Sequence, residues 1–204
     1  MSKRIIKGIL FGILAFALAV ILPLGLTGCS NDKEVIQKGL TDELEALKNP
    51  TEENLKEYLG DELENDANFK ELAEYGLDPY EMMGHLFKHF DYKIGDITVN
   101  GDTATAKVTV TNVKLDEIMA NLETSYMNSK SQEEIAEIYS NGGREALYKD
   151  LFKKLYEDLD KSTDTKDTEL TLSLTKKDNE WSVDDSSEDE LVSAAFGGAN
   201  LSNL

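Results

Sequence analysis

The spacing of hydrophobic residues predicts a first block of helices. Apolar side chains recur every three or four residues between residues 33 and 90, which is the period of an amphipathic helix. Asp78 followed by Pro79 and Glu81 is a start signal, because an N-cap carboxylate, an N1 proline and an acid in the first turn all suit a helix N-terminus. We expect four helices here: Val35 to Leu47, a second capped by Thr51, Asn68 to Tyr75, and Pro79 to Phe90.

From Tyr92 the hydrophobic period falls to two, which predicts a β-hairpin. The alternation in the first strand, Tyr92 to Val99, slips at Gly95-Asp96, and this indicates a bulge. Asn100-Gly101 is a favoured two-residue turn when both central residues take positive φ. The second strand, Ala104 to Val110, alternates with threonine and lysine on its other face.

The remaining pattern predicts two helices, a second hairpin and a last helix. Ser131 and Glu134 form a capping box, and the long helix that they open should break at the paired glycines 142 and 143. Ser187 and Glu190 have the spacing of a second capping box. The expected elements are helices over 116–127 and 131–159, strands over 170–174 and 181–183, and a short helix after Ser187.

This order predicts an α+β domain over residues 33–196. Helices and antiparallel hairpins in separate blocks suit a curved four-stranded antiparallel sheet with helices packed on one face. Residues 197–204 are expected to form a polar C-terminal tail.

The N-terminus has the pattern of a secretory signal, residues 1–28. Lys3, Arg4 and Lys7 precede an uncharged apolar run, and the run ends in Leu26-Thr27-Gly28-Cys29. These last residues resemble the lipobox of bacterial lipoproteins. The resemblance implies cleavage before Cys29, a diacylglycerol on its sulfur, and a tether of residues 29–32 that holds the domain on the extracytoplasmic face of the cell membrane. The alternative is an uncleaved transmembrane anchor, since about 20 apolar residues span a bilayer.

Charge excludes one class of partner. The chain holds 40 acidic and 21 basic residues, and its formal net charge is −19. Nucleic acid is therefore not an expected partner, because phosphate contacts need clustered Lys and Arg. The excess of acid could instead attract cations or basic partners at the cell surface.

The two hairpins resemble a known family. Val99-Asn100-Gly101-Asp102-Thr103-Ala104 and Asn179-Glu180-Trp181-Ser182-Val183-Asp184 are similar to segments of small Gram-positive lipoproteins that carry a domain of unknown function. Those domains look like the nuclear-transport-factor-2-like, cystatin-like roll. The resemblance implies that fold for most of residues 33–196, and it brings no catalytic residues.

Two groups of residues have metal-ligand types. Glu81, His85 and His89 are spaced by four, but three ligands on one helix stripe are too spread for a single ion. Five residues, Asp158, Asp160, Ser162, Asp164 and Glu169, fall at positions 1, 3, 5, 7 and 12 of a calcium-loop template. Thr163 stands where that loop needs glycine, so we expect a solvated acidic loop. We accordingly predict no metal and no cofactor. If a metal is bound, the candidate ligands are His85, His89, Asp160 and Asp164.

No Ser-His-Asp or Cys-His set can be assembled, and the leading hypothesis is a non-enzymatic, lipid-anchored module that binds an unknown protein or small molecule. A solute-binding lipoprotein that serves a transporter is the first alternative. The second is a roll-type acid-base enzyme, for which Tyr92, Tyr126, Tyr139 and Asp96 supply the residue types.

Overall fold

A computed structural model describes residues 32–54, 70 and 74–199. It contains one antiparallel sheet in the order β1-β2-β3-β4, so every neighbouring pair is also consecutive in the chain. The strands are β1 (Asp91–Asn100), β2 (Thr103–Val113), β3 (Thr165–Lys177) and β4 (Glu180–Val183). The predicted α+β class with a curved four-stranded antiparallel sheet is confirmed.

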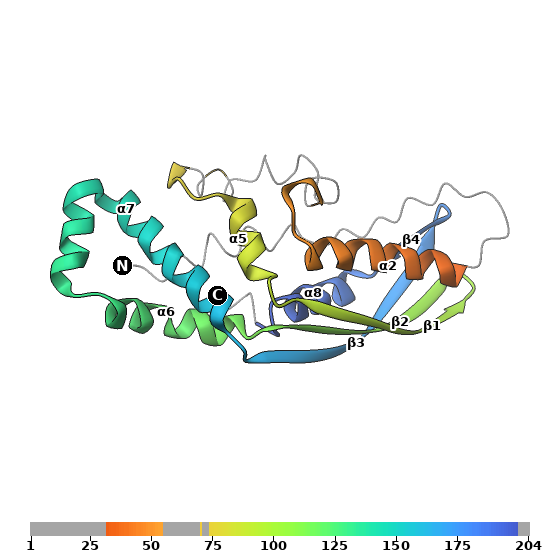
Figure 1. The fold of residues 1–204 in the computed structure, drawn as a ribbon. Coiled ribbons are helices and arrows are strands. Elements are labelled where there is room, and N and C mark those ends of the chain that lie inside the picture. The colour runs from red at the N-terminus through yellow and green to blue at the C-terminus, as the bar shows by residue number, and fades with distance from the viewer. Residues whose placement is uncertain (1–31, 55–69, 71–73, 200–204) are drawn as a thin grey trace.

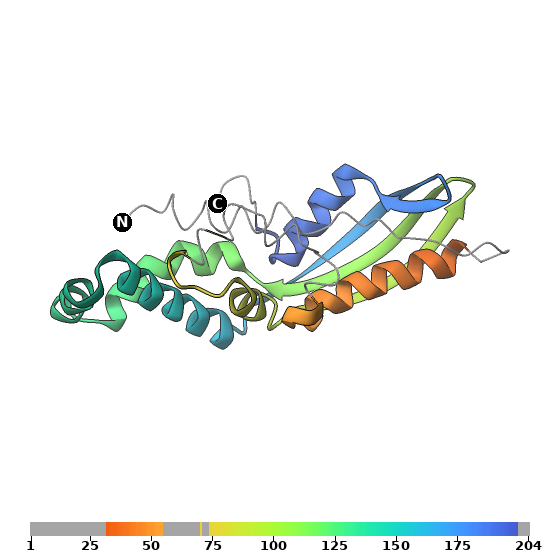
Figure 2. The same ribbon diagram turned by 90° about the horizontal axis from the view of Figure 1, so that it is seen from above.

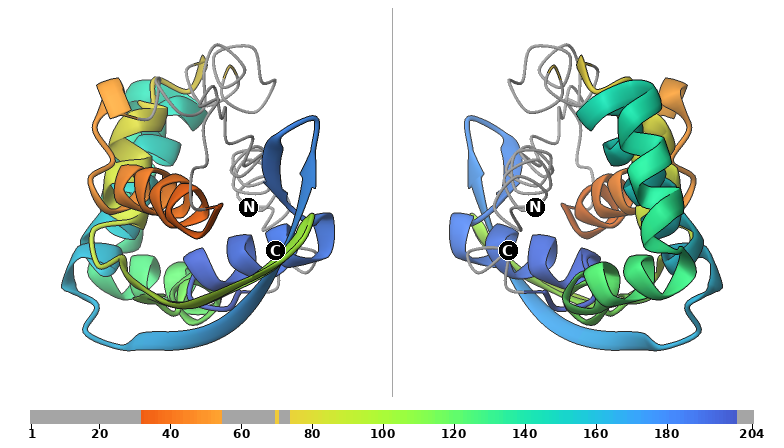
Figure 3. Two further views of the ribbon diagram at one scale, coloured as in Figure 1. Left: turned by 90° about the vertical axis from the view of Figure 1, so that its right-hand side faces the viewer. Right: turned by 90° about the vertical axis from the view of Figure 1, so that its left-hand side faces the viewer.

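Two helices lie on the concave side of the sheet, and three lie toward one end of it (Figure 1, Figure 3). α2 packs on β1, whereas α8 packs on β2 and β3. α6 continues from the end of β2 beyond the sheet, and α7 returns beside it (Figure 2). We call α6 and α7 together the helical arm. The helices are α2 (Asp32–Lys48), α5 (Pro79–Leu86), α6 (Leu115–Ser129), α7 (Gln132–Lys161) and α8 (Asp185–Ala195).

The concave side is filled by apolar side chains. α2 contributes the stripe Ile36, Leu40 and Leu44, each at most 1% exposed. Burying one such side chain stabilises the fold by about 1.5–3 kcal/mol. The largest fully buried side chains come from both helices and sheet: Trp181, Phe87, Phe152, Phe196, Ile36, Leu40 and Leu44.

Asn112 fastens the sheet to its helices where the arm begins. Its Nδ2 donates to the carbonyl oxygens of Leu86 (3.0 Å) and Ala195 (2.7 Å), and its Oδ1 accepts from the Val113 amide (2.8 Å). A buried amide needs such partners, because an unpaired polar group costs about 1–3 kcal/mol. One side chain therefore ties β2 to the ends of α5 and α8.

One predicted feature of the sheet is confirmed, and one is wrong. The register of β1 on β2 shifts between Ile94 and Ile97, which is the predicted bulge. The first turn lies one residue later than expected: Asn100 pairs with Thr103, and Gly101 alone in this turn has positive φ, 63°. Positive φ at only the first central position favours a II′ turn, which needs glycine there.

Two helix ends and the C-terminal tail differ from the sequence-based expectation. α5 ends at Leu86 and not at Phe90, because Phe87 leaves the helical conformation. α8 begins at Asp185, and Ser187 forms no capping box; its Oγ accepts from the Ser173 amide on β3 at 2.9 Å. The first residues of the predicted polar tail also pack against the domain, because Ala199 is buried.

The second predicted helix begins as expected, with Thr51 Oγ1 accepting from the Asn54 amide. Its continuation and most of the predicted 68–75 helix lie outside the described residues.

Candidate functional site

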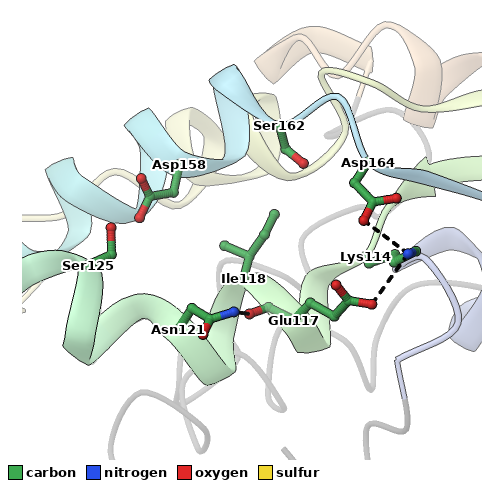
Figure 4. A pocket seen from close by; sticks show the side chains of 8 residues that line it. All are labelled: Lys114, Glu117, Ile118, Asn121, Ser125, Asp158, Ser162 and Asp164. Carbon is green, nitrogen blue, oxygen red and sulfur yellow. Dashed lines mark hydrogen bonds and ion pairs between the residues drawn. The ribbon is translucent and has the colours of Figure 1, made fainter.

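An open pocket lies between α6 and the C-terminal end of α7 (Figure 4). Its volume is about 250 Å³, and Ile118 supplies an apolar side chain among otherwise polar ones. The size is just below the 300–1,000 Å³ common for small-molecule sites. The lining residues are Lys114, Glu117, Ile118, Asn121, Ser125, Asp158, Ser162 and Asp164.

Lys114 is the cation of this pocket, and two carboxylates neutralise it. Its Nζ lies 3.0 Å from Asp164 Oδ2 and 3.3 Å from Glu117 Oε1. Hydrogen bonds to Asp164 and Glu117 raise the pKa of Lys114. An anionic ligand would therefore have to displace a carboxylate, and the pocket best suits a small neutral or cationic polar group.

The structure divides the calcium-loop template between two sides of α7. Asp158 and Ser162 face the pocket, but Asp160 contacts α5. α7 runs through Lys161, and residues two apart on a helix do not face each other. Glu169 lies exposed on β3, opposite Thr109. Asp158 is paired with Lys154 and Asp164 with Lys114, so these oxygens already have cationic partners.

Asp160 joins the two predicted histidines in a helix junction. His85 Nδ1 lies 2.7 Å from Asp160 Oδ1, and His89 Nε2 lies 3.2 Å from the Asp160 carbonyl oxygen. Lys88 Nζ contacts the other carboxylate oxygen at 2.6 Å. Burial opposes the charged form of Asp160, but the hydrogen bonds from His85 and Lys88 outweigh it and lower its pKa. The His85 ring stacks on Tyr156, with ring centroids 4.2 Å apart.

This junction changes the interpretation of the predicted His stripe. Because α5 ends at Leu86, His89 does not continue the helical spacing of Glu81 and His85. Both carboxylate oxygens of Asp160 already have partners, His85 Nδ1 and Lys88 Nζ. Among the residues that the structure describes, no three or more His, Cys, Asp or Glu side chains are grouped so that they could hold a metal ion.

Glu43 is a functional candidate that the sequence reasoning missed. Within the described part of the chain its Oε2 is screened from solvent and has no hydrogen-bond partner. Burial, then the neighbouring carboxylates of Glu188 and Asp42, raise its pKa to about 8. The pKa of Glu188 on α8 is raised as well, by burial and by Asp185 and Asp189. A signal was present, because Glu43 interrupts the apolar stripe of α2 at helical spacing from Leu40 and Leu47.

The first residue of α2 is fixed to the end of the sheet that carries both hairpin turns. Asp32 Oδ1 accepts from Lys176 Nζ at 2.8 Å and from Trp181 Nε1 at 3.2 Å. The amide of Lys176 donates to the carbonyl of Asp102, which joins the two turns. We call this region, residues 100–103 and 176–181, the turn end. The predicted lipidation residue Cys29 lies outside the described residues, three positions before Asp32.

The residues proposed for acid-base chemistry are not brought together. Tyr92 on β1 donates to Glu45 Oε2 of α2 at 2.9 Å, and burial followed by that contact raises its pKa to about 12. Tyr126 joins the two helices of the arm by donating to Asp150 at 2.8 Å. Tyr139 is exposed on the first part of α7, and Asp96 lies exposed in the β1 bulge.

Comparisons of this chain with protein families, with curated protein sequences and with solved structures found no match. In the part of the chain that the structure describes, no helix is long and apolar enough to cross a membrane.

Proposed function

We propose that this protein is a lipid-anchored, non-enzymatic interaction module on the outer face of the cytoplasmic membrane. The observation that carries the proposal is Leu26-Thr27-Gly28-Cys29, a lipobox-like segment that ends an apolar run and contains the only cysteine of the chain. Two acyl chains on one residue provide the second anchoring signal that a single chain lacks.

The position of Asp32 supports a particular orientation of the domain. Three residues span at most about 11 Å, so the Cα of Cys29 lies within that distance of the Cα of Asp32, whose side chain contacts the turn end. The arm is attached at the opposite end of the sheet, where Val113 pairs with Thr165. The turn end therefore faces the lipid headgroups, and the arm projects away from the membrane.

Two observations support the non-enzymatic part of the proposal. The helices of the concave side bury mainly Leu, Ile, Val and Ala, with the carboxylate of Glu43 among them, where a roll enzyme would keep a polar cavity. The tyrosines with acid partners, Tyr92 and Tyr126, bridge elements by hydrogen bonds to Glu45 and Asp150.

The test is the intact mass of the membrane-bound protein. We expect the mass of residues 29–204 plus a diacylglycerol, with or without an N-acyl chain. Cys29→Ser should retain the leader and carry no lipid, whereas the neighbouring change Ser30→Ala should leave the modification in place. A native protein that is full-length and unmodified would contradict the proposal.

The pocket beside Lys114 favours a second candidate, a solute-binding lipoprotein. Its hydroxyls, from Ser125 and Ser162, and its carboxylates suit a small polar solute. Thermal shift against a panel of metabolites and metals separates the two. A stabilisation that Ser162→Ala and Asn121→Ala abolish would favour the solute, and no stabilisation would favour a protein partner.

A further inference from the structure

The far end of the helical arm exposes large hydrophobic side chains. Met127 is 48% exposed and Tyr139 is 53% exposed, and these are the exposed large hydrophobic residues of the described chain. Ile135 and Ile138 are half-buried, and Ile135 lies three residues before Ile138 and four before Tyr139 on α7, the spacings of helix neighbours. We call Met127, Ile135, Ile138 and Tyr139 the tip patch.

A break in α7 separates this patch from the fully buried part of the helix. Gly143 has φ 62° and ψ −145°, and the chain reverses there (Figure 1). All buried residues of α7 lie at Leu147 or beyond, so the segment 132–142 buries no side chain fully. A capping box from Ser131 and Glu134 nevertheless holds this segment helical. An ordered helix that leaves its apolar stripe half-exposed is typical of an interaction surface.

The charges around the patch indicate what can bind there. From Leu115 to Gly142 the only cation is Lys130, and it already contacts Asp150 at 3.2 Å. Glu123, Glu133, Glu134 and Glu137 are the acids toward the tip, whereas Asp116 and Glu117 lie in the first turn of α6 beside the sheet. Arg144 follows Gly143, so acids still outnumber cations at the tip. A second copy would place acid against acid, and anionic lipid would be repelled. A partner with apolar side chains flanked by Lys and Arg matches both the stripe and the charge.

We propose that the tip patch binds a cationic amphipathic segment of a partner protein. The apolar stripe supplies contact area, and the surrounding carboxylates select for Lys and Arg and accelerate association. The inference deepens the proposed function, because it rests on an interaction module and names its binding surface and partner class. Projection of the arm from the membrane presents the tip to that partner.

The experiment uses the full lipid-carrying protein in nanodiscs of zwitterionic lipid. The probe is a fluorescent 18-residue amphipathic helix of Lys and Leu, and its binding to empty nanodiscs is subtracted. We expect Met127→Ser with Tyr139→Ser to weaken probe binding at least fivefold, and Glu133→Lys with Glu137→Lys at least tenfold. The control Glu169→Lys with Glu190→Lys makes the same change of net charge on β3 and α8, and should stay within twofold of the native protein.

Three outcomes separate the alternatives. Equal losses in the control and tip variants would mean general attraction to an acidic protein and would overturn the proposal. If the native protein forms dimers and Met127→Ser with Tyr139→Ser dissociates them, the patch binds a second copy, and this would also overturn the proposal. An unmodified Cys29 in the same sample, with tip-dependent probe binding retained, would remove the lipid anchor but support the tip patch. Circular dichroism checks that each variant keeps its helices.

Discussion

Glu43 places an acid inside the apolar stripe of α2, and this makes the folded state sensitive to pH. Its pKa rises from 4.5 to about 8 on folding, so the folded protein keeps a proton that the unfolded chain releases in this range. The contribution of Glu43 to stability is therefore complete below about pH 4.5 and is lost as the pH rises toward 8. Asp32 and Asp160 act in the opposite direction. Their pKa values are lowered on folding, so they stabilise the folded state at neutral pH, and this stabilisation is lost in acid.

Glu43→Gln should remove this part of the pH dependence, because the amide cannot ionise. Between pH 5 and pH 8 the native protein should lose stability on the order of a few kcal/mol from this group, and the variant should not. Urea unfolding at pH 5, 6.5 and 8 measures the difference. Glu190→Gln, at an exposed position of α8, should keep the native slope. A Glu43→Gln protein with the native slope would show that Glu43 is ionised when folded.

At the scale of elements, Ser187 joins α8 to the sheet. Ser187→Ala would leave the partly buried Ser173 amide of β3 without this acceptor, which costs at most the roughly 1–3 kcal/mol of a fully buried orphaned donor. Ser186→Ala, one residue earlier at an exposed position of the same helix, should change stability by less than about 0.5 kcal/mol. Chemical denaturation of both variants measures this, and equal effects would mean that the contact contributes nothing.

The two glycines Gly143 and Gly84 should respond to alanine with opposite signs. Gly143→Ala forces a side chain into a positive-φ conformation and should destabilise the protein by about 1–2 kcal/mol. A Cβ at Gly84 meets no atom within 4 Å, and Ala is the better helix former by about 1 kcal/mol, so Gly84→Ala should stabilise α5. Thermal melting compares them. A stabilised Gly143→Ala protein would mean that α7 is straight in solution.

The sequence predicted those elements whose signal is local. The capping box at Ser131, the N-cap at Asp78 and the β1 bulge follow from residues a few positions apart, and all three are confirmed. Ser187 was misassigned because its spacing suits a cap, whereas its partner Ser173 is defined by tertiary packing. The candidate site was the least predictable part. His85 and Asp160 lie 75 residues apart, and no local pattern brings them together.

At the scale of the whole molecule, β2 and the arm form one extended body. β2 has 11 residues and α6 has 15, so the distance from the start of β2 at the turn end to the end of α6 is at most about 60 Å. α6 begins two residues after β2 ends, and Asn112 braces this junction against α5 and α8. A membrane anchor at one end and an apolar, acidic patch at the other would allow the protein to bind a partner well above the lipid surface.

Energy transfer from single labels to an acceptor dye in the lipid surface tests this arrangement most directly. Cys29 is the only cysteine and is blocked if it carries lipid, so Lys177→Cys, Glu169→Cys and Asn128→Cys can each be labelled alone. Lys177 lies at the turn end, Glu169 along β3 and Asn128 beside the tip patch. Transfer should be strongest from Lys177, intermediate from Glu169 and weakest from Asn128. Transfer from Asn128 equal to or stronger than that from Lys177 would contradict a body that is anchored by its turn end.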